Sequence, residues 1–159
     1  MPLAVTGPAT FNLLAMWSQN TRAGIRYPSE AFEYPCGQVV EAYESLLDDD
    51  CVVAGDFNHH TRWDEDKQTR DFTAIVDAYR NHGLTSAWHA ARDLEIGDSS
   101  EPATHWFQYQ KDQPYMIDYC FVPSSWTDRI RATWIGGYEA YGSTKPRSDH
   151  APLLVDLAF

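Results

Sequence analysis

Short apolar runs that alternate with amphipathic stretches constrain the fold of this chain more than any other feature. Phe11–Trp17 and Cys51–Ala54 are nearly continuous apolar runs of strand length, which predicts two buried strands. Gly37–Leu47 and Gln68–Asn81 carry apolar residues at helical spacing, and Gly83 predicts the end of the second helix. This order of strand, helix, strand and helix is typical of an α/β domain.

The second half of the chain is dominated by predicted strands. Ala103–Gln108 and Tyr115–Val122 are expected to pair with each other, Arg129–Ile135 alternates like a strand, and Pro152–Leu157 is the last apolar run. The length of 159 residues fits one domain. We therefore expect residues 1–159 to form a single α/β domain with a mixed sheet.

The charge of the chain limits the partners that it can hold. The formal net charge is -11, from 12 basic and 23 acidic residues, and the basic residues form no visible stripe. Proteins that bind duplex nucleic acid through many phosphate contacts usually carry a basic surface. The charge therefore argues against tight, sequence-independent DNA binding by this chain alone. It does not argue against a phosphoester substrate, because a bound divalent cation would invert the local field.

The sequence also indicates a location. It has no apolar run long enough to cross a bilayer and no pattern typical of a signal peptide. Its three cysteines, Cys36, Cys51 and Cys120, lack the spacing of metal ligands. We therefore expect a cytoplasmic protein with reduced thiols and no membrane partner.

A carboxylate and a carboxamide follow the Cys51–Ala54 strand directly. Gly55 allows the backbone to turn, so that Asp56 and Asn58 can point the same way beyond the sheet edge. A carboxylate there can orient or deprotonate a water, and a carboxamide can donate a hydrogen bond to an oxyanion. The alternative is an Asx turn that only ends the strand.

Two further carboxylates lie at predicted strand ends. Asp118 lies within the apolar run Met116–Val122, where burial is costly unless a partner, such as a histidine ring, pairs with it. Asp149 and His150 precede the last strand, and this pair suits metal ligation by the carboxylate and phosphate recognition by the imidazole. A solvent-facing Asp118 and an incidental histidine in a turn are the alternatives.

Taken together, these motifs resemble those of the endonuclease/exonuclease/phosphatase superfamily, which has a deoxyribonuclease-like fold. Gly55–Asn58 is similar to its GD-x-N motif, Ile117–Tyr119 to its ID-hydrophobic strand, and Ser148–His150 to its SDH motif. Thr104–Trp106 resembles the Thr-x-Trp strand that precedes the ID motif in many members. The motifs occur in the family's order, and the resemblance runs from about Phe11 to the end of the chain.

The resemblance implies a role for each motif residue. Asp56 would handle the attacking water, and Asn58 would support that water and the phosphate. Asp118 would orient His150, which would stabilise the transition state. Asp149 would contact the metal, normally Mg²⁺, with Mn²⁺ as the alternative. The implied substrate is a phosphoester, with nucleic acid as one option.

The family pattern is incomplete in this sequence. The family domain opens with a strand that carries an Asn and a strand that ends in Gln-Glu, and the sequence contains no Gln-Glu pair. The resemblance therefore implies the C-terminal portion of a two-sheet α/β sandwich, a truncated domain whose N-terminal strands are missing. One sheet would then leave its inner apolar face bare, which predicts a homodimer.

Two functional interpretations follow from this pattern. The first is a magnesium-dependent phosphoester hydrolase, whether an endonuclease, an exonuclease, a phosphatase or a small-molecule phosphodiesterase. The second is a catalytically inert truncated member that acts as an oligomeric binding or structural module. Several residues outside the motifs stay open between a functional and a structural role: His59 and His60, expected in a solvated loop, and Trp63, His89, His105 and Arg147.

Overall fold

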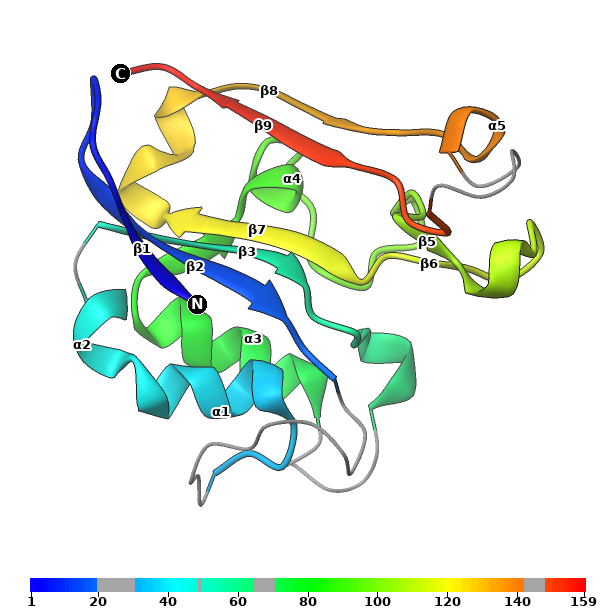
Figure 1. The fold of residues 1–159 in the computed structure, drawn as a ribbon, viewed down its shortest axis with the longest axis horizontal. Coiled ribbons are helices and arrows are strands. Elements are labelled where there is room, and N and C mark those ends of the chain that lie inside the picture. The colour runs from blue at the N-terminus through cyan, green and yellow to red at the C-terminus, as the bar shows by residue number, and fades with distance from the viewer. Residues whose placement is uncertain (20–30, 49, 65–70, 142–147) are drawn as a thin grey trace.

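A five-stranded mixed sheet forms the centre of the computed structural model, which describes residues 1–19, 31–48, 50–64, 71–141 and 148–159. The strand order is β1-β2-β3-β7-β4 (Figure 1). The strands are β1 (Pro2–Val5), β2 (Phe11–Trp17), β3 (Cys51–Asp56), β4 (Leu84–Ser86) and β7 (Asp118–Pro123). Strands β2 and β3 are parallel, and the other neighbours are antiparallel. The mixed α/β fold expected from the sequence is confirmed.

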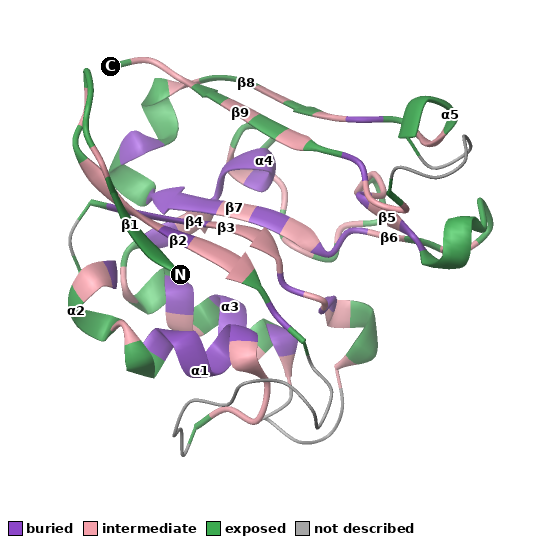
Figure 2. Ribbon diagram, viewed as in Figure 1, coloured by how far each residue is buried: buried purple, intermediate pink, exposed green. Residues whose placement is uncertain are grey.

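Helices cover one face of this sheet. They are α1 (Pro35–Ala42), α2 (Glu44–Leu47) and α3 (Phe72–Asn81) (Figure 1). Alternate residues of β3 and β7 point toward them, and the rings of Phe57, Tyr79 and Phe121 pack against one another in edge-to-face, tilted and stacked arrangements at the centre of this core. Figure 2 shows the buried residues concentrated on the central strands and on the helix faces that meet them. This core holds the ends of β3 and β7 in fixed positions.

The opposite face of the sheet is covered by a separate two-stranded sheet of β8 (Ile130–Ile135) and β9 (Leu153–Leu157). Val155 and Leu157 of β9 pack against a small core that includes Val52 and Val122. The expectation of a bare inner face is therefore wrong, because the chain's own C-terminal strands occupy it. The described residues also form the short helices α4 (Ala87–Ala90) and α5 (Tyr138–Tyr141) and the 3₁₀ turns Thr61–Trp63, Phe107–Tyr109 and Ser124–Arg129.

A third, two-stranded sheet differs from the expected pairing. It joins β5 (His105–Trp106) to β6 (Pro114–Tyr115), whereas the rest of the predicted partner strand is β7 of the main sheet. The chain changes sheet because Met116 and Ile117 are buried in between. The Thr104 hydroxyl oxygen accepts hydrogen bonds of 3.1 Å from the backbone N–H groups of Ile117 and Asp118, which fixes the change of direction.

The predicted helices are confirmed with altered ends. The Gly37–Leu47 segment is interrupted at Tyr43, whose φ of -128° and ψ of 24° are not helical. The second helix begins at Phe72 with the Asp71 side chain as N-cap, and Gln68–Arg70 lie outside the described residues. Gly83 follows the helix with a φ of +71° and its N–H bonded to the Arg80 carbonyl, as predicted. In the described part of the chain, no helix is long and apolar enough to cross a membrane.

Candidate active site

The two carboxylates predicted at strand ends lie directly opposite each other. Strands β3 and β7 are antiparallel, and their register pairs Asp56 with Asp118. The end of β3 therefore meets the start of β7, so that residues 62 positions apart in the sequence converge on one edge of the sheet.

Asn58 holds the Asp56 carboxylate in place. Its backbone N–H donates to Asp56 Oδ1 at 2.8 Å, and its Nδ2 donates to Asp56 Oδ2 at 2.7 Å and to the Ser18 carbonyl at 2.8 Å. Asn58 itself has a φ of +49°, in the left-handed region where asparagine is tolerated. The segment is thus an Asx turn, and in this arrangement the carboxamide orients Asp56.

The turn into Asp56 requires glycine at position 55. Gly55 has a φ of +137°, and a Cβ there would stand 2.0 Å from the Met16 carbonyl oxygen of strand β2. Such a contact is far inside the van der Waals limit, so no other residue fits without moving β2 away from β3. The sequence argument for a sharp turn at Gly55 is confirmed.

Asp118 pairs with His150, as the sequence interpretation required. The His150 Nδ1 lies 2.9 Å from Asp118 Oδ2. Burial alone would lower the pKa of His150, but the hydrogen bond and charge of Asp118, with help from Asp56 and Asp149, outweigh burial and raise that pKa. The ring is therefore held through Nδ1 in a setting that favours its cationic form.

Negative charge is concentrated around Asp56. Burial raises the pKa of Asp56 to about 6, and Asp118 and Asp149 add to the shift, while the Asn58 N–H and His150 oppose it. Asp56, Asp118 and His150 each offer a ligand atom within 4.8 Å of the other two. The group can therefore accept a proton near neutral pH or share a cation.

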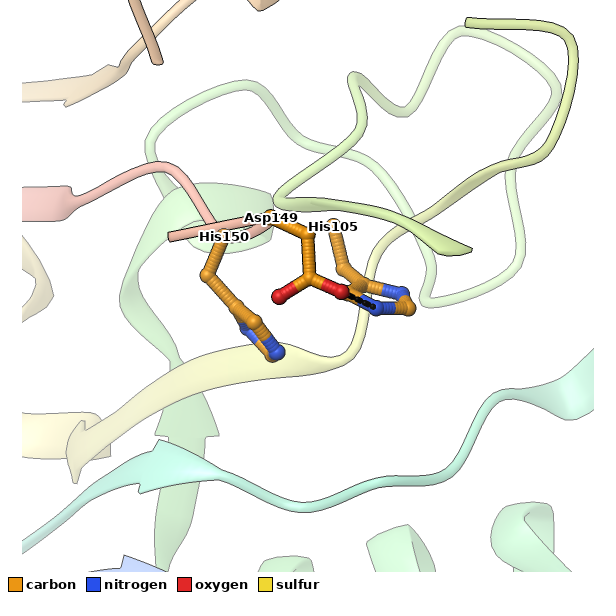
Figure 3. A group of neighbouring side chains, drawn as sticks. All are labelled: His105, Asp149 and His150. Carbon is orange, nitrogen blue, oxygen red and sulfur yellow. Dashed lines mark hydrogen bonds and ion pairs between the residues drawn. The ribbon is translucent and has the colours of Figure 1, made fainter. Parts of the chain in front are cut away.

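His105, whose direction the sequence left open, points toward the same region. Its Nε2 lies 3.3 Å from Asp149 Oδ2, and its ring centroid lies 4.5 Å from that of His150 (Figure 3). Burial lowers the pKa of His105, and the nearby His150 adds to this effect while Asp149 opposes it. His105, Asp149 and His150 form a second group whose ligand atoms lie within 4.8 Å of one another.

A buried carboxylate that the sequence did not single out, Glu101, pairs with two histidines. Glu101 Oε2 lies 2.9 Å from His60 Nε2, and Glu101 Oε1 lies 2.8 Å from His89 Nε2, with both rings and the carboxylate almost fully buried. Burial would raise the pKa of Glu101, but hydrogen bonds from His60, His89 and the Gly97 N–H outweigh it and bring the pKa to about 2. No spacing rule links Glu101 to the histidines.

The histidines that follow Asn58 belong to this buried network. His59 is 3% exposed and stacks against Phe72, and its Nδ1 accepts a hydrogen bond from the His60 N–H at 2.9 Å. The expectation of a solvated loop here is wrong, because the Glu101 carboxylate satisfies the His60 ring and aromatic residues enclose His59. Trp63 is 39% exposed and packs on Tyr115, with the two ring centroids 4.8 Å apart. Arg147 lies outside the described residues.

Two solved structures share this fold. A variant of the 3′ phosphatase NExo from Neisseria, bound to a product DNA hairpin, matches with a TM-score of 0.61 and 15% sequence identity, over 99% of this chain and 65% of that chain. The 3′-5′ exonuclease NExo from Neisseria meningitidis matches with a TM-score of 0.52 and 15% identity, over 78% of this chain and 50% of that chain. The chain thus spans about two thirds of the first and half of the second. No protein-family model and no curated protein matches the sequence.

Proposed function

We propose that this chain is a phosphoester hydrolase whose reaction takes place between the ends of β3 and β7. The observation that carries the proposal is the convergence of two pairs on one edge of the sheet: Asp56 held by Asn58, and His150 held by Asp118. The fold shared with proteins named as a DNA exonuclease and a 3′ phosphatase supports the same chemistry. That likeness gives no comparable support to an inert module.

Each pair has a role in the proposed reaction. Asp56, whose pKa of about 6 lies close to neutral pH, accepts a proton from the attacking water. His150, with Nδ1 held by Asp118, directs Nε2 toward a phosphate oxygen. Its positive charge stabilises the transition state by about 3 kcal/mol. Asn58 keeps Asp56 aligned while the proton moves.

A divalent cation fits the carboxylates of this site. Magnesium is usually held by one or two carboxylates, several waters and the substrate phosphate. We assign Asp149 as its protein ligand, with Mn²⁺ as an alternative ion. Burial raises the pKa of Asp56 most, and the negative charges of Asp118 and Asp149 add to the shift; these like charges support a cation nearby. Such an ion would neutralise charge on the phosphate and acidify the attacking water.

The proposed substrate is the 3′ end of a nucleic acid, bound with modest affinity. The names of the two structural neighbours support a DNA end, whereas the net charge of -11 argues against many phosphate contacts. Binding only the 3′ end of the nucleic acid would need few phosphate contacts, which agrees with both observations. Cytoplasmic location remains part of the proposal, supported by the thiols of Cys36 and Cys120, which form no disulfide among the described residues.

The experiment that tests this function compares three substrates under one condition. We expect release of phosphate from a 3′-phosphorylated DNA hairpin or of nucleotides from the matched 3′-hydroxyl hairpin, with Mg²⁺ and not with EDTA. Supercoiled plasmid DNA tests for endonuclease activity. The His150→Ala variant should lose at least about 100-fold in rate. Equal product with wild type and His150→Ala would contradict the proposal.

A homo-oligomer is a separate part of the proposal. Trp134 and Leu154 face each other across β8 and β9, on the side away from the main sheet, and are 50% and 51% exposed. A second copy would bury this apolar pair. Light scattering at micromolar concentration tests it: a dimer mass that becomes a monomer mass in Trp134→Lys supports the proposal, and a monomer in the wild type contradicts it.

A further inference from the structure

His105, Asp149 and His150 have the spacing of a nearly formed metal site. Each offers a ligand atom within 4.8 Å of the others, and His105 Nε2 is 3.3 Å from Asp149 Oδ2 (Figure 3). In a tetrahedral zinc site the ligands lie about 2.1 Å from the ion, and therefore about 3.4 Å from one another. The edge between His105 and Asp149 already has about this length, and the other two edges are within 4.8 Å.

The backbone beneath these side chains is fixed. His105 and His150 form an isolated antiparallel bridge. The Trp106 N–H donates to the Asp149 carbonyl at 2.9 Å, and the Ala151 N–H donates to the Thr104 carbonyl at 2.7 Å. Two short segments that lie 44 residues apart are thus locked side by side, which pre-organises the three ligands.

The second interaction of His150 matches that of a metal-bound histidine. Histidines that ligate metals usually donate their other ring N–H to a carboxylate, which fixes the tautomer. The His150 Nδ1 makes this contact with Asp118 Oδ2 at 2.9 Å, so Nε2 is the nitrogen available for an ion. His105 Nε2 faces Asp149 Oδ2 and is the nitrogen that would contact the ion, while His105 Nδ1 is buried without a hydrogen-bond partner among the described residues.

The donor set selects the class of ion. Two imidazole nitrogens and one carboxylate oxygen suit Zn²⁺ and neighbouring transition metals, whereas Mg²⁺ prefers oxygen ligands and water. We propose that His105, Asp149 and His150 bind one Zn²⁺-class ion, and that this ion inhibits the hydrolase by occupying His150 Nε2. The binding claim stands alone, and only the inhibition rests on the proposed function.

Titration of metal-free protein with Co²⁺ tests the binding directly, because tetrahedral Co²⁺ with nitrogen ligands absorbs visible light. We expect one Co²⁺ per chain, displaced by Zn²⁺ and not by millimolar Mg²⁺. His105→Gln should weaken Co²⁺ binding by more than about 100-fold. The matched control is His82→Gln, since His82 also pairs with a single carboxylate, Asp48, far along the chain. Equal Kd values for wild type and His105→Gln would overturn the site.

Two checks keep this test decisive. Circular dichroism melting establishes that each variant is folded, and His105→Asn replaces His105→Gln if the latter is not. At fixed Mg²⁺, His105→Gln should need at least about tenfold more Zn²⁺ than wild type for half inhibition of its own activity. Binding through His105 without any hydrolysis would contradict the proposed function and support the metal site. If wild type and His105→Gln hydrolyse substrate and are half inhibited at the same Zn²⁺ concentration, the inhibitory site is wrong and the proposed function stands.

Discussion

His150 Nδ1 lies 2.9 Å from Asp118 Oδ2, although 32 residues separate the two in the sequence. The contact joins the segment before β9 to the first residue of β7, and so connects the small sheet to the main one. It leaves the other ring nitrogen of His150 pointing away from its carboxylate partner. The proposed reaction depends on this pair.

Replacing Asp118 by Asn should reduce kcat by about 10²- to 10⁴-fold with little change in KM. The amide keeps the shape of the side chain but removes the charge that stabilises cationic His150. Steady-state kinetics on the 3′-phosphorylated hairpin measures both constants. Asp156→Asn on the exposed side of β9 is the control and should behave as wild type. A rise in KM alone would mean that Asp118 serves binding.

Asn58 should show separate effects on conformation and on chemistry. Its φ of +49° suits glycine better than alanine. The free energy of unfolding of Asn58→Ala should therefore be about 1 kcal/mol lower than that of Asn58→Gly. Both variants lose the hydrogen bond to Asp56 Oδ2 and should be similarly slow. Urea unfolding and initial rates test the two effects. A fully active Asn58→Gly would show that the backbone turn is sufficient.

Gly55→Ala should prevent stable folding or cost several kcal/mol, on the order of 4. The new Cβ would meet the Met16 carbonyl oxygen at 2.0 Å and force β2 away from β3. Gly137→Ala is the matched control, because a Cβ there meets no atom within 4 Å. Thermal melting compares the two variants. Equal midpoints would mean that β2 and β3 are not paired as described.

Glu101 should make the protein sensitive to acid. Its folded pKa of about 2 lies below the ordinary 4.5, so the carboxylate stabilises the fold above about pH 4.5, and this stability is lost as the pH falls toward 2. This lowering of the Glu101 pKa corresponds to about 3 kcal/mol of folding free energy. Glu101→Gln should be less stable at pH 7 and depend less on pH between 5 and 2.

Urea unfolding at a series of pH values measures this effect. Glu95→Gln provides the comparison, because the Glu95 side chain is 81% exposed and its ion pair with Arg80 lies at the surface. That variant should keep the acid sensitivity of the wild type. If Glu101→Gln and wild type lose stability in parallel below pH 4.5, another carboxylate controls acid unfolding.

The sequence predicted the parts of the fold that have strong periodicity. Strands β2 and β3 and helix α3 follow from apolar runs and helical spacing, and each of them contributes buried residues to the main core. Strands β1 and β4 were not predicted, because one is an exposed edge strand of four residues and the other has only three. Short strands form through their neighbours, and their own residues carry no clear pattern.

The candidate site was predictable where a motif joined polar residues to strand ends. That reasoning brought Asp56, Asn58, Asp118 and His150 together. The motifs did not point to the Glu101 bridge, because its partners His60 and His89 lie 41 and 12 residues away, in a loop and in the short helix α4. The predicted Ala103–Gln108 strand was too long, since Gln108 and Tyr109 have positive φ values that no pattern indicates.

The most direct test of the proposed phosphoester hydrolysis uses bis(p-nitrophenyl) phosphate, a phosphodiester whose cleavage does not require recognition of DNA. We expect steady release of p-nitrophenolate with Mg²⁺ or Mn²⁺, and a rate at least about 100-fold lower in both His150→Ala and Asp56→Asn. Folded wild-type protein that releases no product, or variants that match its rate, would contradict the claim that these residues act on a phosphoester.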